Sequence, residues 1–215
     1  MRRAFSLMEL VLAMALFGIL NVMIFGLLQS GSRSFSIGMS RSSLQGDLNR
    51  SLARLQGEIR RSSASLLSVV ADPSRVVDGC RRDGVCASSL SDWRANSSYS
   101  PNLTPLWDEY VVYYATMQQP GQLIRQTYRP AGSPFTQPMT GFTPATHMTD
   151  IPANHGFSTV VLAHHLEEFR LRYDGGSNIL EVQLLLRRRA GLTPEGRRVN
   201  EERVQAHCQL RLSNP

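Results

Sequence analysis

Apolar residues follow two different patterns in the first part of the chain. Residues 10–28 are almost continuously apolar, interrupted by little more than glycines and Asn21. Over residues 44–59 the apolar positions instead recur every third or fourth residue, at Leu44, Leu48, Leu52, Leu55 and Ile59. A period near 3.6 residues indicates an amphipathic helix with one buried face, whereas an apolar run without a period indicates a segment surrounded by apolar material. The two patterns together predict one long N-terminal helix with two different environments.

The continuous apolar run is long enough to cross a lipid bilayer, because a hydrocarbon core of about 30 Å requires roughly 20 residues of helix. It is too long for the apolar core of an ordinary secretory signal, which has about 7 to 15 residues. Arg2 and Arg3 precede it and favour a cytoplasmic N-terminus. We therefore expect a transmembrane helix over residues 5–28, an amphipathic continuation over 29–62 and an extracytoplasmic head over 63–215.

Glu9 is the one carboxylate at the start of this apolar segment. An ionised carboxylate in the hydrocarbon region costs about 2.5 to 3.5 kcal/mol, so it needs a partner or a location near the headgroups. A simple membrane anchor has no use for such a residue. Glu9 is therefore the best candidate for a functional residue, and a tilted anchor with Glu9 at the headgroups is the alternative interpretation.

Strand patterns dominate the second half of the sequence. Val182, Leu184 and Leu186 occupy every second position, which indicates a strand in a sheet with one covered face. The leucine stripe at 44–59 is the expected cover of that face. Residues 62–105 are rich in Ser, Asp, Gly and Pro and are expected to be irregular. The expected strands are 109–116, 122–129, 166–173, 179–189 and 204–212. The sequence thus predicts an α+β fold with a long N-terminal helix packed on an antiparallel sheet.

Three cysteines are too few for a disulfide-rich scaffold but sufficient for one bridge in an oxidising compartment. Cys80 and Cys86 flank Asp83-Gly84, which is a favourable turn, and we expect them to form a small disulfide loop. Cys208 is an alternative disulfide partner for either of these two cysteines. A structural zinc site is disfavoured, since such sites often use two C-x-x-C pairs and the chain has none.

The N-terminal residues resemble the class III signal of the type IV pilin superfamily. That signal is a short basic leader ending in a small residue, then Phe, then a carboxylate four residues further on, then an apolar helix. Here Arg2, Arg3, Ala4, Phe5 and Glu9 occupy these places. The resemblance implies that a prepilin peptidase removes leader residues 1–4 by cutting between Ala4 and Phe5. It also implies N-methylation of the new Phe5 amine, although Ala4 stands where the family usually has glycine.

The physics of the helix start agrees with this resemblance. A cationic amine on Phe5 needs a counter-charge in lipid or in a dry filament core, and Glu9 of a neighbouring subunit supplies one. Such a pair would set the axial register between subunits. Glu9 is therefore expected to act in filament assembly.

The head is similar to the larger PilW-type minor pilins and the J-type pseudopilins of type II secretion, through residues 107–129 and 162–173. This implies a subunit of low abundance that joins or primes a type IV pilus in a tip complex. Its expected partners are the prepilin peptidase, other minor pilins or pseudopilins, the major pilin and the inner-membrane assembly platform. The resemblance places it first in the inner membrane with its head in the periplasm, and then in a pilus or pseudopilus.

Two alternatives stay open within the family and one outside it. The precursor chemistry is shared by type II secretion pseudopilins and by DNA-uptake pseudopili. A single-pass anchored binding or adhesive protein that is never processed is the rival from another class. Such a protein would keep Met1, and its function would not change when Glu9 is lost.

Enzymatic, metal and nucleic-acid functions have weaker support. The chain has no nucleophile elbow, phosphate-binding glycine loop or HExxH motif, so we expect neither an enzyme nor a cofactor. The histidines and glutamates have no known metal-ligand spacing. The net charge of +6 is spread along the chain, and the short arginine runs are typical of solvated surface, so contact with DNA is a secondary hypothesis. The residues concerned are His147, His155, His164, His165, Glu167 and Glu168 for a metal, and Arg187, Arg188, Arg189, Arg197 and Arg198 for DNA.

Overall fold

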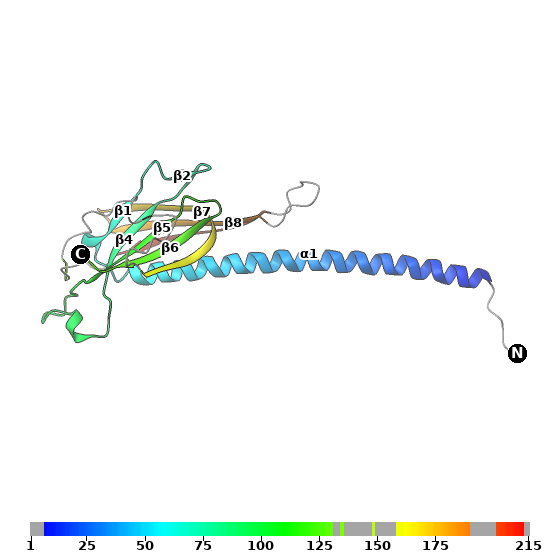
Figure 1. Cartoon of the computed structure of the whole chain (residues 1–215), viewed down its shortest axis with the longest axis horizontal. Helices are drawn as coiled ribbons and strands as arrows, with labels where there is room; N and C mark the ends of the chain where they lie inside the picture. The colour runs from blue at the N-terminus through cyan, green and yellow to red at the C-terminus, as the bar shows by residue number, and fades with distance from the viewer. Residues whose placement is uncertain (1–6, 131–133, 136–147, 149–157, 190–200, 213–215) are drawn as a thin grey trace. The chain divides into compact units, whose positions relative to one another are not determined.

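The computed structural model describes residues 7–130, 134–135, 148, 158–189 and 201–212. It consists of one long helix followed by a β-rich head (Figure 1). By contacts the chain divides into two compact units, Met1–Ser42 and Ser43–Pro215. The elements are α1 (Leu7–Ile59), the short 3-10 helices η1 (Ala64–Leu66) and η2 (Asn96–Ser98), and the strands β1 (Ser68–Val70), β2 (Val76–Val77), β3 (Cys80–Arg81), β4 (Gly84–Ser89), β5 (Glu109–Ala115), β6 (Gly121–Tyr128), β7 (Ser158–Asp174), β8 (Ile179–Arg189) and β9 (Glu201–Arg211).

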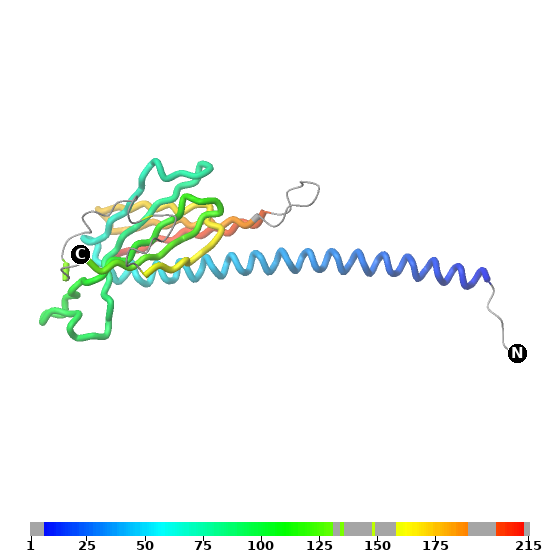
Figure 2. Tube along the Cα trace, viewed as in Figure 1, coloured from blue at the N-terminus to red at the C-terminus, as the bar shows by residue number. Residues whose placement is uncertain are grey.

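Seven of the strands form one antiparallel sheet in the order β1-β4-β5-β6-β7-β8-β9, and β2 pairs with β3 separately. In Figure 2 the green trace of β6 runs beside the yellow start of β7, although a long connection separates them in the sequence. This arrangement confirms the predicted α+β class. The predicted strand at 179–189 has the bounds of β8, and the expected alternation is present because Val182, Leu184 and Leu186 are all buried.

The predicted leucine stripe is also confirmed. All its members, from Leu44 to Ile59, are buried, and they belong to the main core cluster together with inward-facing residues of the sheet. Ser51, which is also buried, donates a hydrogen bond from its Oγ to the carbonyl oxygen of Leu162 at 3.2 Å. Residues 43–59 therefore cover one face of the sheet through apolar contacts and at least one polar contact.

The sequence did not predict that the sheet is covered on both faces. Val111 and Tyr113 of β5 point into the main core, whereas Tyr110, Val112 and Tyr114 point into a second cluster. Successive residues of a strand face opposite sides, so a strand buried on both faces loses its polar alternation. The second cluster also contains Cys86, Ile124 and Met148, with Phe135 packed against it.

The prediction of an irregular segment over residues 62–105 is wrong for residues 68–89, whereas residues 90–105 contain no strand and only the short helix η2. Residues 68–89 contain β4, in which every residue from Gly84 to Ser89 is buried, and three shorter strands. Asp83 and Gly84 do not form an exposed turn, because Asp83 is fully buried and Gly84 begins β4. A side chain at Gly84 would lie 2.4 Å from the methyl carbon of Met148, so glycine here serves close packing.

Candidate functional site

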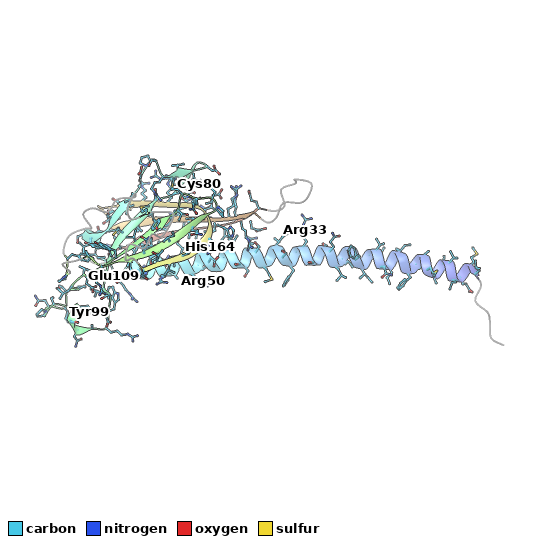
Figure 3. The ribbon with its side chains drawn as sticks, viewed as in Figure 1. Arg33, Arg50, Cys80, Tyr99, Glu109 and His164 are labelled. Carbon is cyan, nitrogen blue, oxygen red and sulfur yellow. The ribbon has the colours of Figure 1, made fainter. Side chains whose placement is uncertain are left out.

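The first part of α1 presents an uncovered apolar surface. Residues 7–36 are all exposed, and Figure 3 shows their side chains projecting on all sides of the helix. The most apolar 18-residue window has a mean hydropathy of 2.5 and is not buried, so by length and composition the helix can cross a membrane. Soluble proteins rarely expose a contiguous apolar patch larger than a few hundred Å². This surface therefore calls for a cover of lipid or of other protein chains.

The polar side chains in this segment differ in whether the helix itself can provide a hydrogen-bond partner. Asn21 donates a hydrogen bond from its side-chain amide to the carbonyl oxygen of Phe17 at 2.8 Å, so the helix itself accommodates it. A carboxylate accepts hydrogen bonds and cannot use a helix carbonyl in this way. Glu9 lies in the first turn of α1 and is exposed, where a negative charge interacts favourably with the helix dipole. Ala4 and Phe5, the predicted sites of cleavage and methylation, lie outside the described residues.

The last turn of α1 carries another carboxylate, Glu58, in a different environment. Glu58 accepts hydrogen bonds from the Tyr113 hydroxyl at 2.5 Å and from Arg125 Nε at 2.9 Å. Burial opposes the charge on Arg125, but the hydrogen bond and the negative charge of Glu58 outweigh it and raise the pKa of the guanidinium. Burial, and then the charge of Glu58, raise the pKa of Tyr113. Glu58 thus joins the amphipathic part of the helix to β5 and β6.

The predicted Cys80–Cys86 disulfide is not formed. Cys80, Cys86 and Cys208 are all thiols in the structure. Cys80 lies in β3 of the small sheet, where Figure 3 labels it, whereas the side chain of Cys86 is buried in the second core cluster beside Tyr110. The turn expected to bring the two cysteines together is absent, because Asp83 is held at the sheet by a hydrogen bond from the Leu171 amide to its Oδ2 at 2.9 Å.

The described histidines and glutamates do not assemble into a metal site. His164 is exposed, and His165 is half-buried with a positive φ of 61°. Glu167 forms an ion pair with Arg187 instead. Within the described ranges no group of three potential metal ligands is found. His147 and His155 lie outside these ranges.

The arginine run at the end of β8 is only partly available for a phosphate backbone. Arg187 forms ion pairs with both Glu167 and Glu201 and is mostly buried. Arg188 is exposed. The side chain of Arg189 and both Arg197 and Arg198 lie outside the part of the chain that the structure describes.

A group of buried charged residues near β3 was missed by sequence reasoning. Arg75 donates from Nε to the carbonyl oxygen of Arg82 at 2.9 Å and from Nη2 to that of Ala115 at 2.6 Å. Asp83 forms an ion pair with Arg81 at 3.1 Å. These contacts tie the β2–β3 hairpin to the main sheet. The sequence contains no signal for them beyond a cluster of charges in a segment without a clear period, and the contact of Arg75 with Ala115 joins residues that are 40 positions apart.

Comparison with known proteins adds no relative. No protein-family model, curated protein or solved structure matches the chain. The architecture itself, one long apolar N-terminal helix with an antiparallel sheet, is compatible with that of pilins.

Proposed function

We propose that the protein is a minor pilin, a structural subunit that joins or primes assembly of a type IV filament through its N-terminal helix. The observation that carries the proposal is the contrast within α1. Its first part exposes an apolar surface headed by Glu9, and its last part is built into a folded head. A subunit that moves from a bilayer into a helical filament needs both features, since its anchor must exchange lipid for protein contacts while the head stays folded.

The proposed maturation begins at the N-terminus. A prepilin peptidase removes residues 1–4, and methylation follows on the amine of Phe5. The new cationic amine needs a counter-charge in an apolar environment, and Glu9 of an adjacent subunit supplies it. Because the charge pair joins two chains, it favours one axial register between them. The function proposed here is therefore mechanical and not catalytic.

The proposed location follows from the same segment. Before assembly the protein spans the inner membrane once, with residues 63–215 in the periplasm. It then enters a pilus or pseudopilus together with other minor subunits and the major pilin, on the inner-membrane assembly platform. Type II secretion pseudopilins and DNA-uptake subunits share this route, so deletion of each platform in turn, followed by assay of filament-bound protein, identifies the filament.

Substitution of Glu9 tests the proposal. Glu9→Gln keeps the size of the side chain but removes its charge, so we expect normal membrane insertion and a loss of roughly tenfold or more in filament-bound protein. A tenfold loss corresponds to about 1.4 kcal/mol, less than a charged hydrogen bond contributes at most. The measurement is quantitative immunoblotting of sheared filaments against membranes.

Asp47→Asn is the matched control for this experiment. It also converts a carboxylate to an amide on α1, but Asp47 lies beyond the apolar segment and pairs with the exposed Arg50. We expect it to enter filaments normally. Equal incorporation of the Glu9→Gln variant and the wild type would contradict the proposed role of the charge pair.

A further inference from the structure

The exposed part of α1 contains a long stretch without ionisable side chains. This stretch covers residues 10–32 and is bounded by Glu9 and Arg33. Both bounding residues are exposed and belong to the unit Met1–Ser42. At 1.5 Å per residue, they lie about 36 Å apart along the helix axis. That distance is greater than the hydrocarbon core of about 30 Å and smaller than a bilayer with its headgroups, about 40 to 45 Å. An upright helix therefore places both charges in the two headgroup layers at once.

The change from apolar to polar residues near Arg33 agrees with this placement. The continuous apolar run ends at Leu28, and Gln29, Ser30 and Ser32 are polar. Residues 10–28 span about 28 Å of helix, which matches the hydrocarbon core. Arg33 follows about 7.5 Å beyond Leu28, whereas each headgroup layer is about 5 to 7.5 Å thick. The Cα atom of Arg33 thus falls at the outer limit of that layer.

Helix geometry directs the side chain of Arg33 towards the bilayer. The Cα–Cβ bonds of a helix tilt towards its N-terminus, and long side chains lie over the preceding turn. For Arg33 the preceding turn is the one next to the membrane. Its side chain is exposed and projects from the helix in Figure 3. Long cationic side chains near the end of a transmembrane helix reach the headgroups in this way.

No carboxylate of the helix competes for Arg33. Its guanidinium makes no hydrogen bond or ion pair with the residues that the structure describes. The nearest acidic residues in the sequence are Glu9 and Asp47, whereas an ion pair within a helix requires a spacing of three or four residues. A guanidinium donates two parallel hydrogen bonds to a phosphate group. Lipid phosphate is the acceptor that a bilayer provides at this depth.

We propose that Arg33 binds the phosphate groups of phospholipids in the outer leaflet and so fixes the depth of α1 in the bilayer. The proposal rests on the membrane stage of the proposed function. Without Arg33 the stretch that lacks ionisable side chains would continue to residue 40. That extension contains Phe35 and Met39, which are 70% and 59% exposed and favour insertion. Arg33 is therefore the residue that opposes deeper insertion.

Solid-state NMR tests the contact with phosphate. The full chain, labelled with ¹³C at the Cζ atoms of arginine, is placed in vesicles of phosphatidylcholine and phosphatidylglycerol. Dephasing of the Cζ signals by ³¹P reports guanidinium groups next to phosphate. Arg2 and Arg3, which are expected at the opposite surface, contribute equally to every sample.

Arg41 provides the matched control for this measurement. It is also an exposed arginine of α1, but it lies about 12 Å beyond Arg33 and outside the headgroup layer. We expect Arg33→Gln to remove the dephased signal of one arginine and Arg41→Gln to remove none. An equal dephased signal in Arg33→Gln and in the wild type would overturn the proposal.

A depth measurement in the same vesicles decides the proposal even if Arg33→Gln disturbs insertion. A fluorescent amino acid replaces Ser32, and lipids carrying a nitroxide in the headgroup or in the acyl chain quench it. With Arg33 present, the headgroup nitroxide should quench more strongly. Arg33→Leu should reverse this order because the label moves inward, and Arg41→Leu should not.

Stronger quenching by the acyl-chain nitroxide with Arg33 present, quenching by neither nitroxide, or an unchanged order in Arg33→Leu would overturn the proposal. The vesicles contain no other filament subunits. A failure here therefore leaves the filament function to be decided by the incorporation of Glu9→Gln, which is a separate measurement.

Discussion

The two parts of helix α1 contain similar apolar residues in opposite settings. Leu20, in the first part, is 53% exposed, whereas Leu55, in the last part, is 1% exposed. Apolar residues surround the first part on all sides, but in the last part they form one stripe that faces the sheet. The period of the apolar residues, and not their number, therefore distinguishes a helical segment that packs on its own chain from one that is covered by lipid or by another chain.

Removing a leucine from each part gives the largest expected contrast. Leu55→Ala should lower the free energy of unfolding of the head by about 2 to 5 kcal/mol, because it leaves a cavity in the main core. Leu20→Ala should change it by less than about 0.5 kcal/mol. The measurement is urea unfolding of the full chain in detergent, followed by the fluorescence of Trp93 and Trp107. An equal loss of unfolding free energy in the two variants would contradict the distinction between the two parts of α1.

Glu9 and Glu58, near opposite ends of α1, give the next contrast. Glu58→Ala should cost the head about 1.5 to 3 kcal/mol, the range for hydrogen bonds to charged groups, because Tyr113 and Arg125 both lose an acceptor. Glu9→Gln should leave head stability unchanged and act only on assembly. The same unfolding assay measures both variants, and a double-mutant cycle with Arg125→Ala isolates the pairwise contribution. A cycle that gives no coupling energy would show that Glu58 does not join the helix to the sheet.

Alkaline pH should distinguish the parts by an effect that is smaller for each pH unit. Burial raises the pKa of Cys86 from 9.0 to about 12, and burial followed by the charge of Cys86 raises the pKa of Tyr110 from 10.0 to about 12. Both groups hold their protons more tightly in the folded head. Their contribution to stability is therefore fully present below about pH 9 and is lost as the pH rises through 12, by at most about 1.4 kcal/mol per pH unit for each group.

Cys86→Ala should make this decline shallower, as measured by urea unfolding at pH 8.5 and at higher pH in steps of about one unit, which resolve the slope expected from linkage. Residues 10–32 contain no ionisable side chain, so the helicity of the apolar segment gives an internal reference in the same samples by circular dichroism. An unchanged slope in the variant would assign the alkaline loss to other groups.

The parts of the fold that rest on a regular period were predictable from the sequence. The leucine stripe and β8 both show a clear period, of a helix and of a strand, and both appear where the pattern places them. β4 was missed because its residues, Gly-Val-Cys-Ala-Ser-Ser, are small and are buried on both faces. Such a strand has no polar alternation, and Val85 is its only β-branched residue.

The candidate sites differ in the same way. Glu9 stands out because a charge borders an apolar run, which is visible in a few consecutive residues. The buried charged residues Arg75 and Asp83 instead depend on contacts with Ala115 and Leu171, which are far away in the sequence. The expected Cys80–Cys86 bridge failed for a related reason, since long-range contacts of Asp83 override the local preference for a turn.

Mass spectrometry of the N-terminal peptide tests the proposed filament function most directly. The protein is recovered from membranes of cells with and without an active prepilin peptidase, and its first peptide is identified. We predict a peptide that begins at N-methylated Phe5 in cells with the peptidase and at Met1 in cells without it. An intact Met1 in both, or cleavage beyond Leu28, would contradict the pilin assignment and favour an anchored or secreted protein.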